Sequence, residues 1–135
     1  MTSVFLDTVG LIALWDESDQ WHESAQRAFD LFTPKASVRL VTTTFVLLEC
    51  GNASARRAYR KDVADLWNAL DRTSDLIRPS EVQLTEAWSR YASGQPGSAG
   101  IVDHVSFVVM RELDIAAAFT NDAHFRAEGF ETLMK

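Results

Sequence analysis

Short apolar runs alternate along the chain with longer segments in which apolar residues recur at helical spacing. Runs rich in branched and aromatic residues predict strands at 3–7 (SVFLD), 38–43 (VRLVTT), 75–79 (DLIRP), 115–122 (IAAAFTND) and 130–134 (FETLM). Helical spacing predicts helices at 8–16, 21–32, 57–70, 81–92 and 101–113, and another that carries FVLLEC. Strands that alternate with helices predict an α/β fold with a mainly parallel sheet covered on both faces.

Local signals mark where several of these elements begin. Thr43 or Thr44 can cap the helix that carries FVLLEC, and Ser80 with Gln83 forms a capping box before the fifth helix. The glycine-rich stretch 93–100 (SGQPGSAG) is expected to be a flexible loop. With 135 residues and no internal repeat or long linker, the chain is expected to form a single domain over residues 1–135.

Composition limits the classes of protein that need to be considered. With 47% hydrophobic and 24% charged residues, the chain has the composition of a globular protein. Its apolar runs are shorter than the roughly 20 residues that cross a bilayer, and MTSVFLD lacks the basic start of a secretory signal. The single cysteine, Cys50, fits a reducing cytoplasm and reads as a buried apolar residue more readily than as a nucleophile. We therefore expect a cytoplasmic protein without a membrane partner.

Four acids stand out from the 19 acidic residues of the chain. Most of the others, such as Glu128, lie in polar helix-surface contexts and are expected to be solvated. Asp7 and Asp122 end predicted strands, Glu49 directly follows four apolar residues, and Asp103 interrupts IVDHVSF. In open parallel sheets ligands bind beyond the carboxyl ends of the strands, which is where Asp7 and Asp122 are expected.

Each of these acids also has a purely structural interpretation. Asp7 or Asp122 could cap the following helix, and Asp103 could interact with the dipole at the start of its own helix. Glu49 could pair with Arg56, which lies about two helical turns further on. Taken singly, each acid leaves this alternative open.

Taken together, the four acids predict a cation site. Carboxylates that share one pocket repel one another, and hard oxygen ligands suit Mg²⁺ or Mn²⁺, which activate water and offset phosphodiester charge. The three histidines, His22, His104 and His124, are scattered, so no zinc-binding spacing competes. A net charge of −6 disfavours nonspecific attraction to nucleic acid, but it does not exclude a nuclease with a local basic track.

The blocks VFLDTVGLIAL, LLECGN, IVDHVSFVVM and FTNDAHFRAEGF resemble those of PIN-domain ribonucleases, specifically the VapC-type toxins of bacterial toxin–antitoxin pairs. The resemblance implies a three-layer α/β/α fold and an Mg²⁺- or Mn²⁺-dependent endoribonuclease. It also implies a homodimer and a small antitoxin that blocks the site. The implied metal ligands, which also make up the catalytic set, are Asp7, Glu49, Asp103 and Asp122.

The resemblance also bears on residues around these ligands. Thr8, Ser106 and Asn121 lie near them in the sequence and could hold them by hydrogen bonds, although caps and buried hydroxyl contacts are equal alternatives. His124 stands where many relatives carry another acid, so a fifth carboxylate ligand is not expected here. Some of the tryptophans Trp21, Trp67 and Trp88 are candidates for an apolar patch used in self-association, although ordinary core packing is the alternative for each.

RNA contacts are expected at the densest basic cluster, in ARRAYRK. If the helix of Glu49 continues far enough, Arg56 and Arg60 share its face, and these two with Arg57 and Lys61 would bind phosphates. The alternative is a solvated face that pairs with nearby acids.

Two other functions remain open from the sequence. A receiver-type phosphoacceptor domain is also α/β, but it needs an acid beside Asp7 and a lysine late in the chain, where the sequence has only Lys135. A catalytically silent PIN-like binding module is the second alternative.

Overall fold

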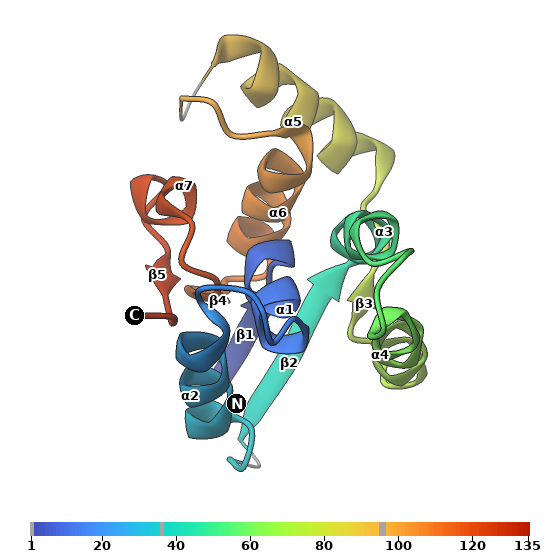
Figure 1. Ribbon diagram of the computed structural model, residues 1–135. Coiled ribbons are helices and arrows are strands. Elements are labelled where there is room, and N and C mark those ends of the chain that lie inside the picture. The colour runs from blue at the N-terminus through green and yellow to red at the C-terminus, as the bar shows by residue number, and fades with distance from the viewer. Residues whose placement is uncertain (1, 36, 95–96) are drawn as a thin grey trace.

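The computed structural model describes residues 2–35, 37–94 and 97–135, and these form five strands in one sheet (Figure 1). The strands are β1 (Thr2–Leu6), β2 (Val38–Thr43), β3 (Leu76–Ile77), β4 (Ala117–Phe119) and β5 (Glu131–Thr132). Their order is β3-β2-β1-β4-β5, and every neighbouring pair is parallel. The expected mainly parallel sheet is therefore confirmed, and within the described chain it is parallel throughout.

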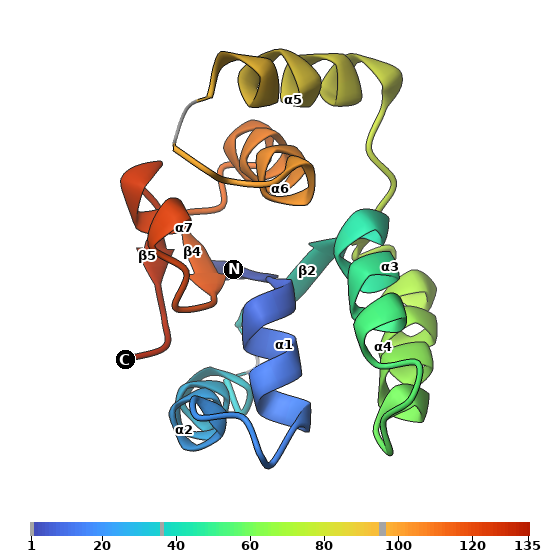
Figure 2. The same ribbon diagram turned by 45° about the horizontal axis from the view of Figure 1, so that its top comes forward.

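Helices lie on both sides of the sheet, as expected for a three-layer α/β/α fold. They are α1 (Thr8–Trp15), α2 (His22–Phe32), α3 (Thr44–Ala53), α4 (Arg60–Arg72), α5 (Glu81–Ser93), α6 (Ile101–Glu112) and α7 (Ala123–Ala127). Figure 2 shows α1 and α2 on one side of the strands, with α5 and α6 on the other. No helix in the described part of the chain is long and apolar enough to cross a membrane.

The direction of the chain across the sheet reverses at β1. From β1 the chain moves to β2 and β3, and it then returns to β4 on the opposite side of β1. The register pairs Leu6 with Phe119, so β1 and β4 reach their carboxyl ends side by side. The residues that follow these two strands, Asp7 and residues 120–122, therefore meet at the point where ligands bind in sheets of this kind.

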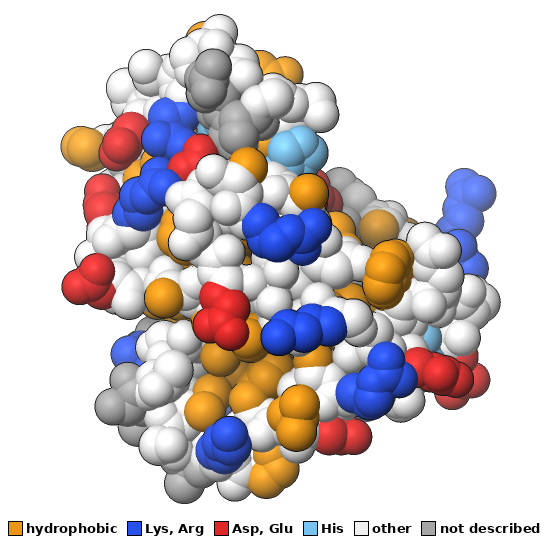
Figure 3. All heavy atoms as spheres, turned by 90° about the vertical axis from the view of Figure 1, so that its left-hand side faces the viewer, with side chains coloured by type: hydrophobic (Ala, Val, Ile, Leu, Met, Phe, Trp, Pro, Cys, Tyr) orange, Lys and Arg blue, Asp and Glu red, His pale blue; other side chains and the backbone are white. Residues whose placement is uncertain are grey.

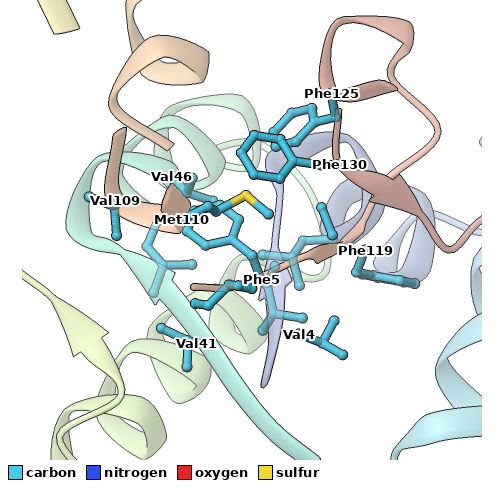
Figure 4. Close-up of a cluster of buried hydrophobic side chains, with 14 of the residues drawn as sticks. Val4, Phe5, Val41, Val46, Val109, Met110, Phe119, Phe125 and Phe130 are labelled. Carbon is cyan, nitrogen blue, oxygen red and sulfur yellow. The ribbon is translucent and has the colours of Figure 1, made fainter. Parts of the chain in front are cut away.

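Aromatic and branched side chains fill the space between the sheet and its helices (Figure 4). Phe5 and Phe119 are fully buried on adjacent strands, and Phe107 of α6 packs edge-on against Phe125 of α7. Burial of such large side chains contributes roughly 1.5–3 kcal/mol each. This shared core fixes the strand ends relative to α6 and α7.

Gly10 allows α1 to lie directly against β4. A Cβ atom on Gly10 would come within 2.1 Å of the carbonyl oxygen of Phe119, closer than any real side chain approaches. The absence of a side chain therefore sets the spacing between the start of α1 and the end of β4.

Several boundaries differ from those predicted by the sequence. The helix expected at 57–70 begins at Arg60, and the strand expected at 115–122 is reduced to Ala117–Phe119. Helix α7 was not predicted at all. Thr43, not Thr44, caps α3 by accepting a hydrogen bond from the N–H of Val46 (3.2 Å).

Other sequence predictions are confirmed. The capping box of α5 is present, with Ser80 and Gln83 bonded reciprocally. Gly94, at a φ of 75°, ends α5, but residues 95 and 96 of the expected loop lie outside the described residues. Cys50 is fully buried, and burial raises the pKa of its thiol to about 12, which agrees with an unreactive core residue.

Candidate metal centre

Asp7 lies at the junction of β1 and α1 and is only 1% exposed. It is the N-cap of α1, because its Oδ2 accepts a hydrogen bond from the N–H of Val9 (3.3 Å). The same oxygen accepts a hydrogen bond from the hydroxyl of Thr120 (2.8 Å), which follows β4. Thr120 in turn accepts a hydrogen bond from the N–H of Asp122 (3.1 Å). One threonine therefore joins the acid after β1 to the acid after β4.

Asp103, Asp122 and His124 form the tightest group of possible metal ligands. Each offers one ligand atom, and these three atoms all lie within 4.8 Å of one another. Asp103 is in the first turn of α6, and Asp122 is the N-cap of α7, where its Oδ1 accepts from the N–H of His124 (2.9 Å). Both carboxylates are partly buried.

Glu49 lies at the outer edge of the site. Its side chain is exposed, although the preceding run of apolar residues suggested a buried setting. The hydroxyl of Thr8 donates to Glu49 Oε1 (2.5 Å), which ties α3 to the first residue of α1. Within the described residues no ion pair joins Glu49 to Arg56, so the structural alternative for this acid is not realised.

The four predicted acids interact electrostatically. Burial and the neighbouring charge of Asp103 raise the pKa of Asp7 from 3.8 to about 7, against the opposing hydrogen bond from Thr120. Burial, then Asp122 and Glu49, raises the pKa of Asp103 to about 6. Asp7 and Glu49 do not belong to the 4.8 Å group. Their charges nevertheless interact with that of Asp103, because Asp103 raises the pKa of Asp7 and Glu49 raises the pKa of Asp103. The acids form one cluster in which negative charge is costly without a cation.

The donors in this cluster fit a divalent cation. Carboxylate oxygens are the usual ligands of Mg²⁺ and Mn²⁺, and imidazole nitrogen adds to the affinity for transition metals. The Nδ1 atom of His124 is buried and has no hydrogen-bond partner among the described residues, although it lies 2.9 Å from Asp122 Oδ1. A bound ion would satisfy this nitrogen and relieve the repulsion between the acids.

Helix α7, which carries His124, is held in place by an ion-pair cluster. Glu128 was expected to be solvated, but its side chain is only 8% exposed. It pairs with Arg90 of α5, and its Oε2 accepts from Arg111 of α6 at 2.7 Å. The prediction of a solvated Glu128 is therefore wrong, because α5 and α6 enclose it.

The sequence also named three residues as possible hydrogen-bond donors to the ligands. Thr8 has such a contact, to Glu49. Ser106 is fully buried and donates to the carbonyl oxygen of Val102 (3.0 Å), so its hydroxyl takes the structural role instead. The backbone oxygen of Asn121 accepts a hydrogen bond from Arg126 (3.2 Å), and among the described residues no hydrogen bond joins the Asn121 side chain to the acids. Thr120 and His124 were not predicted in these roles.

The basic cluster is not a continuation of the helix face of Glu49. Helix α3 ends at Ala53, and Arg56 and Arg57 follow in turns before Arg60 begins α4. The geometric premise that Arg56 and Arg60 share this face is therefore wrong.

Two residues of the basic cluster have acidic neighbours other than the four acids of the site. Arg57 contributes to the lowered pKa of Asp16, behind the hydrogen bonds from Ser18, and so lies near the end of α1 remote from Asp7. Lys61 pairs with Asp65 (3.5 Å), as the alternative interpretation expected.

Comparisons with known proteins agree with this fold. Neither a family model nor a curated protein sequence matches the chain. A solved structure of Mycobacterium tuberculosis VapC20, described as a toxin that cleaves the sarcin–ricin loop, matches with a TM-score of 0.80 and 25% identity. The match covers 98% of this chain and 99% of that one.

Two further solved structures match with lower identity. FitAcB from Neisseria gonorrhoeae has a TM-score of 0.63 and 14% identity, over 96% of both chains. DNA-bound VapBC from Salmonella typhimurium has a TM-score of 0.64 and 14% identity, over 98% of this chain and 97% of the matched one. The chain therefore has the fold of the VapC-type PIN-domain toxins over nearly its full length.

Proposed function

We propose that this protein is a divalent-metal-dependent endoribonuclease and the toxin of a toxin–antitoxin pair. The observation that carries the proposal is the convergence of acids at the carboxyl ends of β1 and β4, in a chain with the fold of VapC-type toxins. The acids come from four separate segments, and folding for stability alone gives no reason to gather them.

Each acid has a distinct role in the proposed site. Asp103 and Asp122 hold the ion, with Asp7 behind them and Glu49 at the rim. Thr8 and Thr120 orient Glu49 and Asp7 through their hydroxyls. When bound, Mg²⁺ or Mn²⁺ activates water and offsets negative charge on the scissile phosphate. Because burial and the charge of Asp103 raise the pKa of Asp7 to about 7, metal binding competes with a proton on Asp7 and becomes stronger as the pH rises.

The substrate and partner are proposed from the comparisons. VapC20 is described as cleaving the sarcin–ricin loop, so this RNA loop is the first substrate to test. The likeness to FitAcB and VapBC supports a small antitoxin as partner, and a short reading frame beside the gene would encode it. Contacts between RNA and Arg56, Arg57, Arg60 or Lys61 stay a prediction.

RNA cleavage by purified protein tests the proposal. We expect cleavage with Mg²⁺ or Mn²⁺, none in excess chelator, and a loss of about 10- to 100-fold or more in Asp7→Asn. Asp30→Asn removes an exposed acid on α2 and should retain the wild-type rate. Undiminished cleavage in chelator, or equal rates for the two variants, would contradict the metal-dependent mechanism.

A further inference from the structure

The arrangement around His124 extends the proposed metal site and rests on that proposed function. His124 is the second residue of α7, directly beyond the N-cap Asp122. Its ring lies beside the two carboxylates, because one ligand atom of His124 is within 4.8 Å of a carboxylate oxygen of Asp103 and of one of Asp122. On the far side of the ring, Nε2 lies 3.4 Å from the hydroxyl oxygen of Ser98. One nitrogen therefore faces the acids while the other contacts a hydroxyl.

Metal-binding histidines have this arrangement. Their second ring nitrogen contacts an oxygen that fixes the tautomer and the ring orientation. Here Nδ1 is buried, lies 2.9 Å from Asp122 Oδ1, and makes no hydrogen bond with the described residues. A buried nitrogen without a hydrogen-bond partner is unfavourable, and a metal ion between this nitrogen and the two carboxylates would supply the missing partner.

We propose that His124 supplies a nitrogen ligand to the ion held by Asp103 and Asp122, which makes the site selective for Mn²⁺ over Mg²⁺. Mg²⁺ prefers oxygen ligands in near-octahedral geometry and retains its waters, whereas first-row transition ions accept imidazole readily. A site made of oxygen ligands alone would bind both ions with less discrimination. The nitrogen therefore sets which ion occupies the site.

Metal binding and pulsed electron paramagnetic resonance test the assignment on the intact protein. We expect ¹⁴N modulation from imidazole in the spectrum of bound Mn²⁺, and its loss in His124→Gln. Calorimetry should show that His124→Gln weakens Mn²⁺ binding about tenfold or more and Mg²⁺ binding less. The matched control is His22→Gln, because His22 contacts the carbonyl oxygen of Ala13 at the far end of α1 and should keep the signal.

A second variant covers the case in which His124→Gln does not fold. His124→Asp replaces the nitrogen by an oxygen ligand and should lower the preference for Mn²⁺ over Mg²⁺ while ion binding persists. If Mn²⁺ binds without ¹⁴N modulation, or if no His124 variant changes the preference, His124 is a positively charged partner of the acids and the inference is overturned. If the wild-type protein binds neither Mn²⁺ nor Mg²⁺, the proposed metal-dependent function is contradicted together with the inference about His124.

Discussion

At the scale of single residues, Asp7 combines a structural and a chemical role. It caps α1 and accepts the hydroxyl of Thr120, yet its burial beside Asp103 makes its charge unfavourable in the absence of a cation. Active sites often retain such groups although they lower the stability of the folded protein. Because the charge of Asp7 depends on whether its carboxyl group is protonated, the effect of Asp7 on stability depends on pH.

Stability of the metal-free protein should fall as the pH rises from about 4 to 7. The pKa of Asp7 is 3.8 in an unfolded chain and about 7 in the folded protein. Between these values the folded state binds more protons than the unfolded state, so the free energy of unfolding decreases with rising pH. Asp103, whose pKa is raised to about 6, contributes with the same sign. Urea unfolding in chelator at several pH values measures this slope.

Asp7→Asn should remove the larger part of that slope. Asparagine caps helices as well as aspartate does, so the start of α1 is preserved. At pH 8 the variant should exceed the wild type in stability by up to about 4 kcal/mol, at about 1.4 kcal/mol for each pH unit between the two pKa values. The difference should vanish at pH values well below 4, where Asp7 is protonated in both states. A variant with the wild-type slope would show that the charge of Asp7 costs nothing in the fold.

Some residues of the site could be predicted from the sequence, and others could not. An acid directly after a buried strand is a local pattern, so Asp7 and Asp122 were recognisable. The contact of Asp7 with Thr120 joins residues 113 positions apart, and it depends on the register of β1 with β4, which no local pattern contains. The role of His124 depends on α7, and its five residues are too few for helical periodicity to show.

At the scale of elements, the contact of α1 with β4 positions the two halves of the site. The helix begins at Thr8 and crosses the end of β4 at Gly10, where the two backbones touch. The sequence predicted both elements, but not their close approach. An isolated glycine within a helical pattern was the available signal, since glycine is unfavourable there unless packing requires it.

Gly10→Ala should destabilise the protein although alanine favours helices. The added Cβ would meet the backbone of Phe119, so α1 must move, at a cost of about 1–3 kcal/mol or more. Gly51→Ala is the matched control, because its Cβ in α3 would meet nothing within 4 Å and should stabilise by roughly 0.5–1 kcal/mol. Denaturant unfolding compares the pair. Equal stability of the two variants would contradict the close contact.

At the scale of the whole molecule, apolar side chains are exposed on α5 and, on a different face, on α2 beside the strands. Trp21, Trp67 and Trp88 lie on or beside α2, α4 and α5, which Figures 1 and 2 show apart, so the three do not share one surface. Trp67 packs against the core, as its structural alternative expected, whereas Trp88 is exposed. On α5, Trp88 and Tyr91 are 54% and 47% exposed and pack edge-on. Figure 3 shows a second gathering of hydrophobic side chains low on the face formed by α7, β5 and α2. A groove of about 470 Å³ that includes Leu31 lies between α2 and the ends of the strands.

We predict a homodimer that uses the aromatic surface of α5. Its exposed aromatic rings are the residue type enriched in interface cores. Trp88→Ser should give a monomer by light scattering, whereas Leu31→Ser, which changes a 72% exposed residue in the other surface, should leave the dimer intact. A wild-type monomer at high micromolar concentration would exclude self-association. If Leu31→Ser dissociates the dimer and Trp88→Ser does not, the dimer interface lies at the groove and not on α5.

The contact at Gly10 also limits how this protein can be inhibited. At Gly10 the backbone of α1 lies directly against the backbone of Phe119, which leaves no room for α1 to move toward the end of β4. The backbone segments that carry the acids are therefore rigid. A binding partner could deform them only at a large cost in free energy, since packed interiors resist deformation. An inhibitor, whether a protein or a small molecule, must act by covering the acids or occupying their ion, and its effectiveness will depend on how well it seals the rim at Glu49.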